Sequence, residues 1–362
     1  MNRLLYILLI TPLLFARAQN KASDSLVAYT AFVSDDTTIY GITNKGALSA
    51  WNVKTLEKVY ASADSTLHYT ALAKDRNNTI YLGSTGRIDT LNRKDFSASP
   101  LIKLKKNYGV SHIFFTSQNK MYLIISGGIY NPLKNKGWSN FKNKPSGMVV
   151  KKRFLYFFRK KTNSYFTQPG YAFIDSNDRI WMGASYGEFG GVLNAFDTQQ
   201  EKPLFVDYGL NFGSIYPNSI FEDADKKIYI TSGLQHFMNS GEIFKIDGKK
   251  DASQIYNSSD YEDKEQMFDG IFIGPGAYNT TEHKLYFASS NGFYRASVPK
   301  DGKLTDVELL FSPQLTALRE NLAIGMQMAV KEVTFLPDNR LIFRTAANGI
   351  GVYNGKEVIM LR

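Results

Sequence analysis

Short runs of alternating apolar and polar residues recur along almost the whole chain, separated by polar turns. The clearest run has an apolar residue followed by an aromatic one, a short alternating segment, a turn with glycine, and a second alternating segment. Runs of period two bounded by Gly, Asn and Asp predict β-strands and hairpins. Copies of this pattern, the last without the aromatic residue, begin at Ile39, Ile80, Met121, Ile180, Ile228, Leu285 and Leu341.

The spacing of these copies predicts the fold class. Successive copies begin 41, 41, 59, 48, 57 and 56 residues apart, and the shortest spacing matches a propeller blade of roughly 40 to 45 residues. A polar turn such as Asp175–Asp178, preceded by a further apolar segment, lies ahead of most copies. We therefore predict an all-β fold, a β-propeller with seven blades of four antiparallel strands. A long β-sandwich or a β-helix would not explain the short period.

Two of the hairpins carry a strong turn signal. Asn291–Gly292 and Asn348–Gly349 each lie between two predicted strands. Asn-Gly is typical of a two-residue turn in which both residues take positive φ. We expect this turn in both places.

One copy resembles the repeat of a known group of propellers. The segment FIDSNDRIWMGASYG, which begins at Phe173, and the following GVLNAFD resemble the repeat of two-component-regulator-type propellers. The resemblance implies a blade in which Asp175 and Trp181 are structural residues. Propellers of that group serve as periplasmic sensor parts of membrane kinases. No kinase segment follows in this sequence, so that role is not carried over.

The first residues predict export. Arg3 is followed by the apolar run Leu4–Phe15 and then by Ala16–Ala18, a small-x-small cleavage signal. These features are typical of a signal peptide, and the run is too short to span a bilayer. We predict a signal peptide over 1–18, a single seven-bladed propeller over 19–362, and a secreted or periplasmic protein. No other stretch is long and apolar enough to suggest a membrane span.

The amino-acid composition excludes some kinds of site and indicates a possible partner. The sequence contains no cysteine, which excludes disulfides, thiolate metal sites and a lipid anchor on cysteine. The formal net charge is +10, and ten Lys and Arg with no acid lie between Pro132 and Asn163. Such a stretch could meet a polyanion, or could simply be a solvated surface. Export makes nucleic acid the least expected partner. The candidate polyanion-binding residues are Lys134, Lys136, Lys142 and Lys144.

Loop length points to one face of the propeller. In a blade of four antiparallel strands, the hairpin between the second and third strands and the connection to the next blade open on the same face. We expect long hairpins on that face at Gly127–Ser146 in blade three, Tyr186–Phe189 in blade four and Leu234–Ser240 in blade five, and long connections after blades three to six. Loops on a rigid scaffold often bind ligands. The predicted ligand-binding residues are Trp138, Tyr186, Glu188, Phe189, Gln235, His236 and Asn239.

No strong catalytic motif is present. His236 and Glu188 are weak candidates for acid–base work, because both lie in hairpins of the favoured face. His112 falls within a predicted first strand and is expected to be buried and structural. An acidic loop on the same face could suit calcium, but it lacks the usual spacing of a calcium loop, so no cofactor is predicted. This loop contains Asp260, Glu262, Asp263, Glu265 and Asp269.

Two functions remain open. The first is a binding module, acting outside the cytoplasm as a monomer, that recognises a glycan, peptide or protein on its loop-rich face. The second is a polysaccharide-degrading lyase or hydrolase with its site on that face. Propellers host both kinds of function, so the fold does not decide between them. Convergence of His236, Glu188 and a basic residue in one pocket would favour the enzyme.

Overall fold

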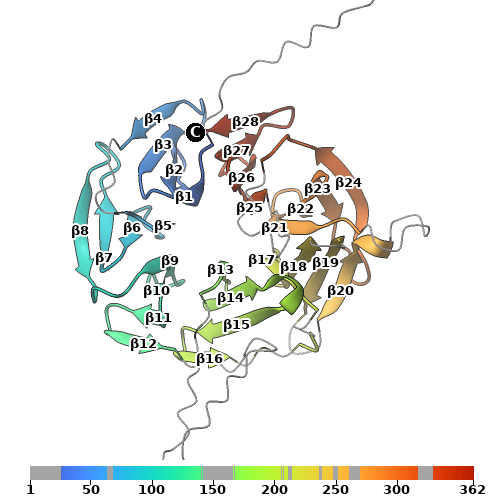
Figure 1. The fold of residues 1–362 in the computed structure, drawn as a ribbon, viewed down its shortest axis with the longest axis horizontal. Coiled ribbons are helices and arrows are strands. Elements are labelled where there is room, and N and C mark those ends of the chain that lie inside the picture. The colour runs from blue at the N-terminus through green and yellow to red at the C-terminus, as the bar shows by residue number, and fades with distance from the viewer. Residues whose placement is uncertain are drawn as a thin grey trace, which may run out of the picture.

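The computed structural model describes residues 26–62, 68–139, 141, 166, 168–204, 206, 208–210, 214–235, 239–247, 252–260, 270–316 and 329–362. In these residues the chain forms seven four-stranded antiparallel sheets, which stand around a central axis (Figure 1). Within each sheet the strands follow sequence order from the axis to the rim. The predicted seven-bladed β-propeller is confirmed.

Each blade is one continuous segment of the chain. The strands of blades one to four are β1 (Tyr29–Ser34), β2 (Thr38–Thr43), β3 (Leu48–Asn52), β4 (Lys58–Ala61), β5 (Ala71–Lys74), β6 (Ile80–Ser84), β7 (Arg87–Leu91), β8 (Ala98–Lys103), β9 (Val110–Phe115), β10 (Met121–Ile125), β11 (Gly128–Asn131), β12 (Lys136–Trp138), β13 (Tyr171–Ile174), β14 (Arg179–Ser185), β15 (Gly191–Asp197) and β16 (Lys202–Leu204). Those of blades five to seven are β17 (Pro217–Glu222), β18 (Ile228–Gln235), β19 (Asn239–Ile246), β20 (Ser253–Asn257), β21 (Ile273–Asn279), β22 (Lys284–Ser289), β23 (Gly292–Ser297), β24 (Thr305–Phe311), β25 (Val330–Phe335), β26 (Leu341–Thr345), β27 (Ile350–Tyr353) and β28 (Val358–Leu361).

The repeated aromatic residue and the Asp of the preceding turn are hydrogen-bonded to each other. In blade four, one carboxylate oxygen of Asp175 accepts backbone N–H bonds from Asn177 (2.9 Å) and Arg179 (2.8 Å). The other accepts a bond from Trp181 Nε1 at 2.9 Å. The turn is thereby fastened to the second strand, which explains why the two residue types recur together. Equivalent bonds join Tyr40 to Asp35, Tyr81 to Asp75 and Tyr229 to Asp223.

The two Asn-Gly hairpins form, but with a different turn from the one predicted. Ser289 pairs with Gly292, so the loop of the first is Ser290–Asn291. Positive φ occurs only at the glycines, 137° at Gly292 and 95° at Gly349. Asn291 and Asn348 stay outside the left-handed region, so the prediction of positive φ at both turn residues was wrong. Glycine is nevertheless needed, since a Cβ at Gly349 would lie 2.2 Å from the backbone oxygen of Leu361.

The long segments between strands do open on one face. We call it the loop-rich face; it carries the hairpins between second and third strands and the connections between blades. The longest connections follow β12, β16, β20 and β24, and blade four has a long hairpin between β14 and β15, as predicted. The predicted long loop Leu234–Ser240 in blade five was wrong, because β18 and β19 pair as far as Gln235 and Asn239. On the opposite face, here the turn face, the segments between strands are short. The strand ends that the long segments connect therefore all lie on one side of the ring.

The prediction of a long hairpin in blade three was wrong. Ile125 pairs with Gly128, so the β10–β11 hairpin is tight. The extra length instead follows β12, whose three residues pair with β11. Lys134 therefore lies in the turn between β11 and β12 on the turn face, and Lys136 and Trp138 lie in the outermost strand.

The ring closes without exchange of strands between the two ends of the chain. The fourth strand of the last blade is β28, from the same segment as β25 to β27. The first and last blades are joined by side chains and by one bridge, in which Val27 N donates to Ala347 O at 2.8 Å. Arg344 also donates to the backbone oxygen of Tyr29 at 2.9 Å. An apolar cluster that includes Trp51 and Ile342 fills the space between these blades.

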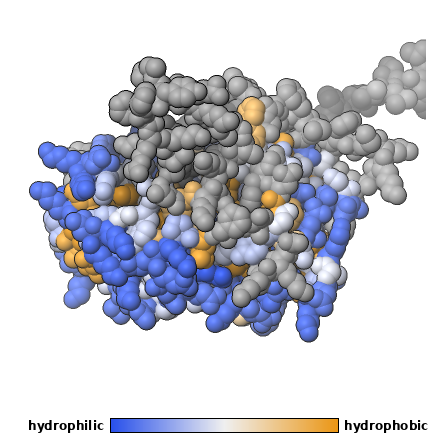
Figure 2. All heavy atoms as spheres, turned by 90° about the horizontal axis from the view of Figure 1, so that it is seen from below, coloured by the Kyte–Doolittle hydropathy of each residue, from blue (hydrophilic) through white to orange (hydrophobic). Residues whose placement is uncertain are grey.

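The core lies between neighbouring blades. Trp181 and Leu193 of blade four, for example, pack in one cluster with Ile220 and Ile230 of blade five. Seen edge-on, the described surface is mainly hydrophilic, with apolar residues showing in small patches (Figure 2). The rigid part of the molecule is therefore a ring of stacked sheets, with the innermost strands around its axis.

Candidate functional site

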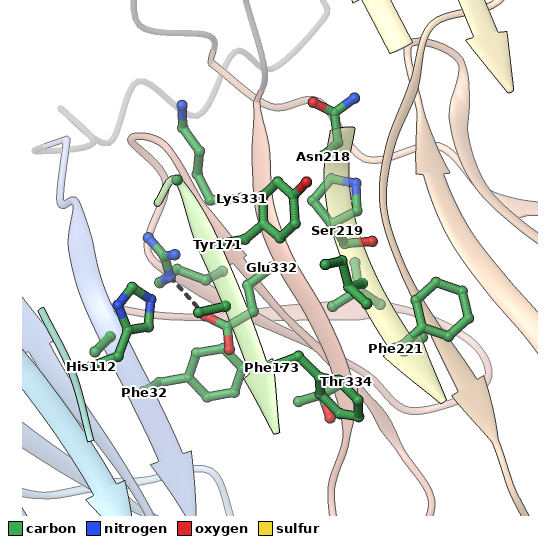
Figure 3. Close-up of a pocket in the computed structure, with 18 of the residues that line it drawn as sticks. Phe32, His112, Tyr171, Phe173, Asn218, Ser219, Phe221, Lys331, Glu332 and Thr334 are labelled. Atoms are coloured by element: carbon green, nitrogen blue, oxygen red, sulfur yellow. Dashed lines mark hydrogen bonds and ion pairs between the residues drawn. The ribbon is translucent and has the colours of Figure 1, made fainter. Parts of the chain in front are cut away.

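A cavity of about 410 Å³ lies on the axis of the propeller. Residues of the innermost strands of all seven blades line it. Because first strands run from the loop-rich face to the turn face, residues near their beginnings lie toward the loop-rich face. Figure 3 shows Asn218 and Lys331 at that end, and Phe32, Phe173 and Thr334 at the other. The cavity falls within the usual size range for small-molecule sites, roughly 300 to 1,000 Å³.

The charged residues of the cavity are organised by Arg344. Its Nε donates to the Glu332 carboxylate at 3.1 Å, drawn as the dashed line in Figure 3. Glu332 and Arg344 are direct cross-strand partners in blade seven, and the bond from Arg344 to Tyr29 holds the guanidinium against blade one. The pair is fixed in place from two sides, as a recognition group should be.

His112 faces the cavity from β9, across the central opening from β25 and β26 (Figure 1). Its Nδ1 lies 3.0 Å from the hydroxyl of Ser111. Burial, and then the positive charge of Arg344, lower the pKa of His112 to about 4. The imidazole is therefore neutral near pH 7 and offers both a donor and an acceptor. His112 was expected to be a buried structural residue, but it lines the cavity.

Two residues that line this cavity each have a buried polar atom without a partner within the described part of the chain. One is Oδ1 of Asn218, a residue with only 4% of its surface exposed, and the other is the hydroxyl of Tyr171. The amide nitrogen of Asn218 donates to the backbone oxygens of Ile273 (2.6 Å) and Gly233 (3.3 Å). Buried polar groups are usually hydrogen-bonded. Both atoms are themselves enclosed by neighbouring protein atoms, so they lie behind the surface of the cavity.

The end of the cavity toward the turn face is largely aromatic. Phe32, Phe114, Phe173, Phe221 and Tyr278 line it from five different blades. Polar groups gather at one end of the cavity and aromatic rings at the other, so the site can orient a ligand that has two unlike ends.

Of the predicted site residues in blades four and five, the described Tyr186, Phe189 and Asn239 do not line this cavity. Tyr186 precedes the short 3-10 helix η1 (Gly187–Phe189), and Phe189 is 64% exposed. Asn239 begins β19, which is paired with β18 almost to the hairpin tip. These strands extend further than the predicted loop Leu234–Ser240 allowed. For Glu188 and Gln235 the structure describes the backbone only, and His236 lies outside the described residues.

Trp138, Lys134 and Lys136 are also away from the cavity. Trp138 packs against Phe196, with ring centroids 4.9 Å apart, and Lys136 lies 5.0 Å from the centroid of Trp138. Lys134 and Lys136 both form ion pairs with Glu201. Lys142 and Lys144 lie outside the described residues, so binding of a polyanion by this stretch stays a prediction.

The described residues contain no group of three or more His, Cys, Asp or Glu arranged to hold a metal ion. Of the acidic loop proposed for calcium, only Asp260 is described, and it forms an ion pair with Lys303. A search of the same residues for a helix able to cross a membrane found none.

Sequence reasoning missed the cavity because its residues come from seven distant segments. Ser111 and His112 are adjacent polar residues in the strand β9, and Asn218 lies beside Ser219 in β17. The alternating pattern of a strand shows which residues share a face of the sheet. It does not show which of them also face the central axis rather than the neighbouring blade. One signal in the sequence could have indicated the cavity. Polar residues recur near the start of several first strands, at the same distance from the turn that leads to the second strand.

Comparison with known proteins gives the fold. No known protein family matches the sequence, and no curated protein is similar to it. Among solved structures, the extracellular domain of BT4673 from B. thetaiotaomicron matches over 92% of this chain with 15% identity and a TM-score of 0.56. This chain spans only 39% of the length of that one.

Two other structures are similar over most of their own length. Hydrazine synthase of Kuenenia stuttgartiensis matches with 12% identity and a TM-score of 0.57, over 92% of this chain and 96% of that one. The structure of U3-55K matches with 13% identity and a TM-score of 0.53, over 90% of this chain and 92% of that one. At such identities, likeness establishes the fold alone. The chain is a β-propeller.

Proposed function

We propose that this chain is an exported binding protein whose ligand site is the central cavity, entered from the loop-rich face. The observation that carries the proposal is the set of polar groups that the innermost strands β9 and β25 and the second strand β26 place around the cavity: the fixed Arg344–Glu332 pair and His112. A concave site with a few convergent polar groups and a shifted histidine pKa is the usual form of a ligand site. The predicted partners, a glycan, a peptide or a protein, all offer suitable polar groups.

Two further observations support an extracytoplasmic binding role. The first 18 residues have the pattern of a signal peptide. The similar propellers of BT4673 belong to the extracellular domain of a one-component or hybrid two-component system. An extracellular domain of a signalling system is a place where a propeller would meet a ligand.

The alternative is a polysaccharide-degrading enzyme. A general base works best when its pKa lies near the operating pH, and His112, with a pKa of about 4, is a weak base by that measure. The described cavity therefore favours binding over acid–base chemistry. The pair His236 and Glu188, proposed for catalysis on the loop-rich face, stays a prediction.

The test is a screen of the purified protein against neutral and acidic oligosaccharides and peptides, which follows both binding and the appearance of new reducing or unsaturated ends. The proposal expects a compound that binds without being cleaved, and an Arg344→Met variant that binds it at least about tenfold more weakly. Turnover by the protein would establish the enzyme instead. Binding that Arg344→Met leaves unchanged would place the site outside the cavity.

A further inference from the structure

The central cavity contains polar atoms that are accessible and have no partner among the described residues. The Glu332 carboxylate is bound by Arg344 through one oxygen, Oε2, and Arg344 uses Nε and Nη1 in its two bonds. This leaves Oε1 of Glu332, Nη2 of Arg344 and Nε2 of His112 for a ligand. All three atoms keep accessible surface, whereas the unpartnered atoms of Asn218 and Tyr171 are enclosed by protein. A ligand in the cavity can therefore meet a charged acceptor, a charged donor and an imidazole nitrogen.

The free donor of Arg344 and the free acceptor of Glu332 belong to two groups that are already joined. Arg344 and Glu332 are direct cross-strand partners, and Nε of Arg344 lies 3.1 Å from Oε2 of Glu332. Nη2 is attached to the same guanidinium carbon as Nε, and Oε1 to the same carboxylate carbon as Oε2, so one small ligand can reach both atoms. To satisfy both, it must present an acceptor and a donor on the same edge.

Few chemical groups present a donor and an acceptor on one edge. A carboxylate only accepts and an ammonium group only donates, so each would leave one of the two atoms unsatisfied and would meet a like charge. A trans peptide group directs its N–H and its C=O to opposite sides. Two neighbouring hydroxyls, or a primary amide, can present a donor and an acceptor together. The Arg344–Glu332 pair therefore suits a diol or a primary amide.

The charges of the described residues that line the cavity are balanced. They belong to two acids and two bases, Glu222, Lys331, Glu332 and Arg344. The Glu222 carboxylate accepts bonds from the backbone N–H and the hydroxyl of Ser176, both at 2.9 Å, and Lys331 also has an interaction partner. The histidine of the cavity is neutral near pH 7. A charged ligand would lose its hydration here without gaining a free counter-charge, so a neutral ligand is favoured.

Aromatic rings follow the polar groups down the wall of the cavity. His112 and Phe114 are two residues apart in β9, and their rings are within 9° of parallel, with centroids 6.0 Å apart. Phe114 and Phe173 are half-buried and line the cavity, so their exposed ring surface can cover apolar C–H groups. The exposed hydroxyl residue Thr334 stands at the same end as Phe173 (Figure 3). A sugar ring offers an apolar face and several further hydroxyls, which a primary amide lacks.

The two sides of the cavity are close enough to share one ligand, since the positive charge of Arg344 acts on the imidazole of His112. Given the proposed binding function, on which this step rests, we infer that the cavity binds a neutral sugar unit. Two neighbouring hydroxyls of the sugar bridge Arg344 and Glu332, and a third meets Nε2 of His112. One C–H face of the sugar ring lies on Phe114 and Phe173.

Matched probes test the ligand class by calorimetry or ligand-observed NMR. The neutral probes are the methyl β-glycosides of D-glucose, D-galactose and D-mannose. The uronide of each replaces its CH2OH group by a carboxylate, and benzamide supplies a primary amide on an aromatic ring. We expect at least one neutral glycoside to bind about tenfold more tightly than its uronide and than benzamide. Equal or tighter binding of the uronide or of benzamide, or failure of all three glycosides to bind, would overturn the assignment.

Glu332→Gln tests the role of the charged pair. The variant loses the carboxylate and leaves the guanidinium of Arg344 without its counter-charge. Binding of the neutral glycoside should fall at least about tenfold, and its uronide should now bind more tightly than the glycoside itself. A purely structural role of Glu332 would weaken the binding of both compounds alike. An unchanged preference for the neutral glycoside in Glu332→Gln would overturn the inference.

Phe114→Leu tests the aromatic wall by a change that keeps an apolar side chain. We expect it to weaken binding of the neutral glycoside about fivefold. The matched control is Phe115→Leu, since Phe115 is the next residue of the same strand and is also half-buried, but does not line the cavity. The control should keep the affinity of the unchanged protein. Equal affinities of the two variants would show that the ring of Phe114 does not contact the sugar.

These outcomes separate the two proposals. If a peptide or a uronide binds and Arg344→Met removes that binding, but no neutral glycoside binds, the neutral-sugar inference fails and the cavity remains the site. If Arg344→Met and Phe114→Leu both leave the binding of every compound intact, the cavity itself is not the site.

Discussion

Replacing Asp175 by Asn tests the physical reason for the blade repeat. The amide keeps one oxygen for the backbone N–H groups of Asn177 and Arg179, but turns an NH2 group toward the donors Trp181 Nε1 and Arg179 Nε. Trp181 is 1% exposed, so its N–H would be left buried and unpaired, at a cost of about 1–3 kcal/mol. Loss of the partly exposed ion pair with Arg179 adds about 0.5–1 kcal/mol. We expect a total loss of about 1.5–4 kcal/mol.

The assay is urea unfolding followed by tryptophan fluorescence and far-UV circular dichroism. The matched control is Asp225→Asn, an exposed residue in the equivalent turn of blade five, expected to change stability by less than about 0.5 kcal/mol. Repeating Asp175→Asn in a Trp181→Phe background should reduce its cost, because the indole N–H is then absent. Equal effects of Asp175→Asn and Asp225→Asn, or the same cost in both backgrounds, would refute the reasoning.

Two other predictions concern charge. Burial raises the pKa of Asp35 and Asp75, but the hydrogen bonds that each accepts outweigh it, so both have a pKa below the ordinary value. Their contribution to stability is therefore present above about pH 4 and lost as the pH falls through their lower folded-state pKa. When urea unfolding is measured from about pH 7 to about pH 2, the midpoint should fall below about pH 4, and it should fall less in Asp75→Asn than in the unchanged protein. Glu201→Gln removes the partner of Lys134 and Lys136 and should strengthen retention on heparin more than Glu357→Gln, an exposed residue whose replacement changes net charge equally. Equal retention of these two variants would show that the two lysines do not contact polyanions.

The fold could be predicted because its signals are local. The pair of an apolar and an aromatic residue, as in Ile39–Tyr40, recurs in part because in four blades the aromatic residue donates a hydrogen bond to the Asp of the preceding turn, here Asp35. Tight turns with Gly mark the hairpins in the same way. Seven copies of this short sequence pattern were enough to predict the number of blades. No knowledge of contacts between distant residues was needed.

The third blade shows where local signals fail. Strand β12 contains only Lys136–Trp138 and carries no alternating pattern, so it was interpreted as part of a hairpin loop. What makes it a strand is pairing of Trp138 with Ile129 and packing of its indole on Phe196 in the next blade. Contacts between blades decided the structure there, and these are not visible in the residues themselves.

The candidate site could not be predicted for a related reason. Asn218 and Lys331 face the axis because a bulge adds one residue to each strand, and an alternating pattern does not show where the extra residue lies. Arg344 reaches the cavity from a second strand, and its partner Tyr29 is at the other end of the chain. The site depends on ring closure, which brings the first and last blades together.

The most direct test of the central claim uses the absence of cysteine from the sequence. A single cysteine at Gly170, labelled with a bulky methanethiosulfonate reagent, would occupy the cavity, whereas one at Tyr186 would occupy the loop-rich face outside it. Binding of the sugar and peptide panel is measured before labelling, after labelling, and after release of the label with reductant. We predict that the label at residue 170 abolishes binding reversibly and the label at residue 186 does not. Binding that survives at 170 and is lost at 186 would contradict a ligand site on the axis.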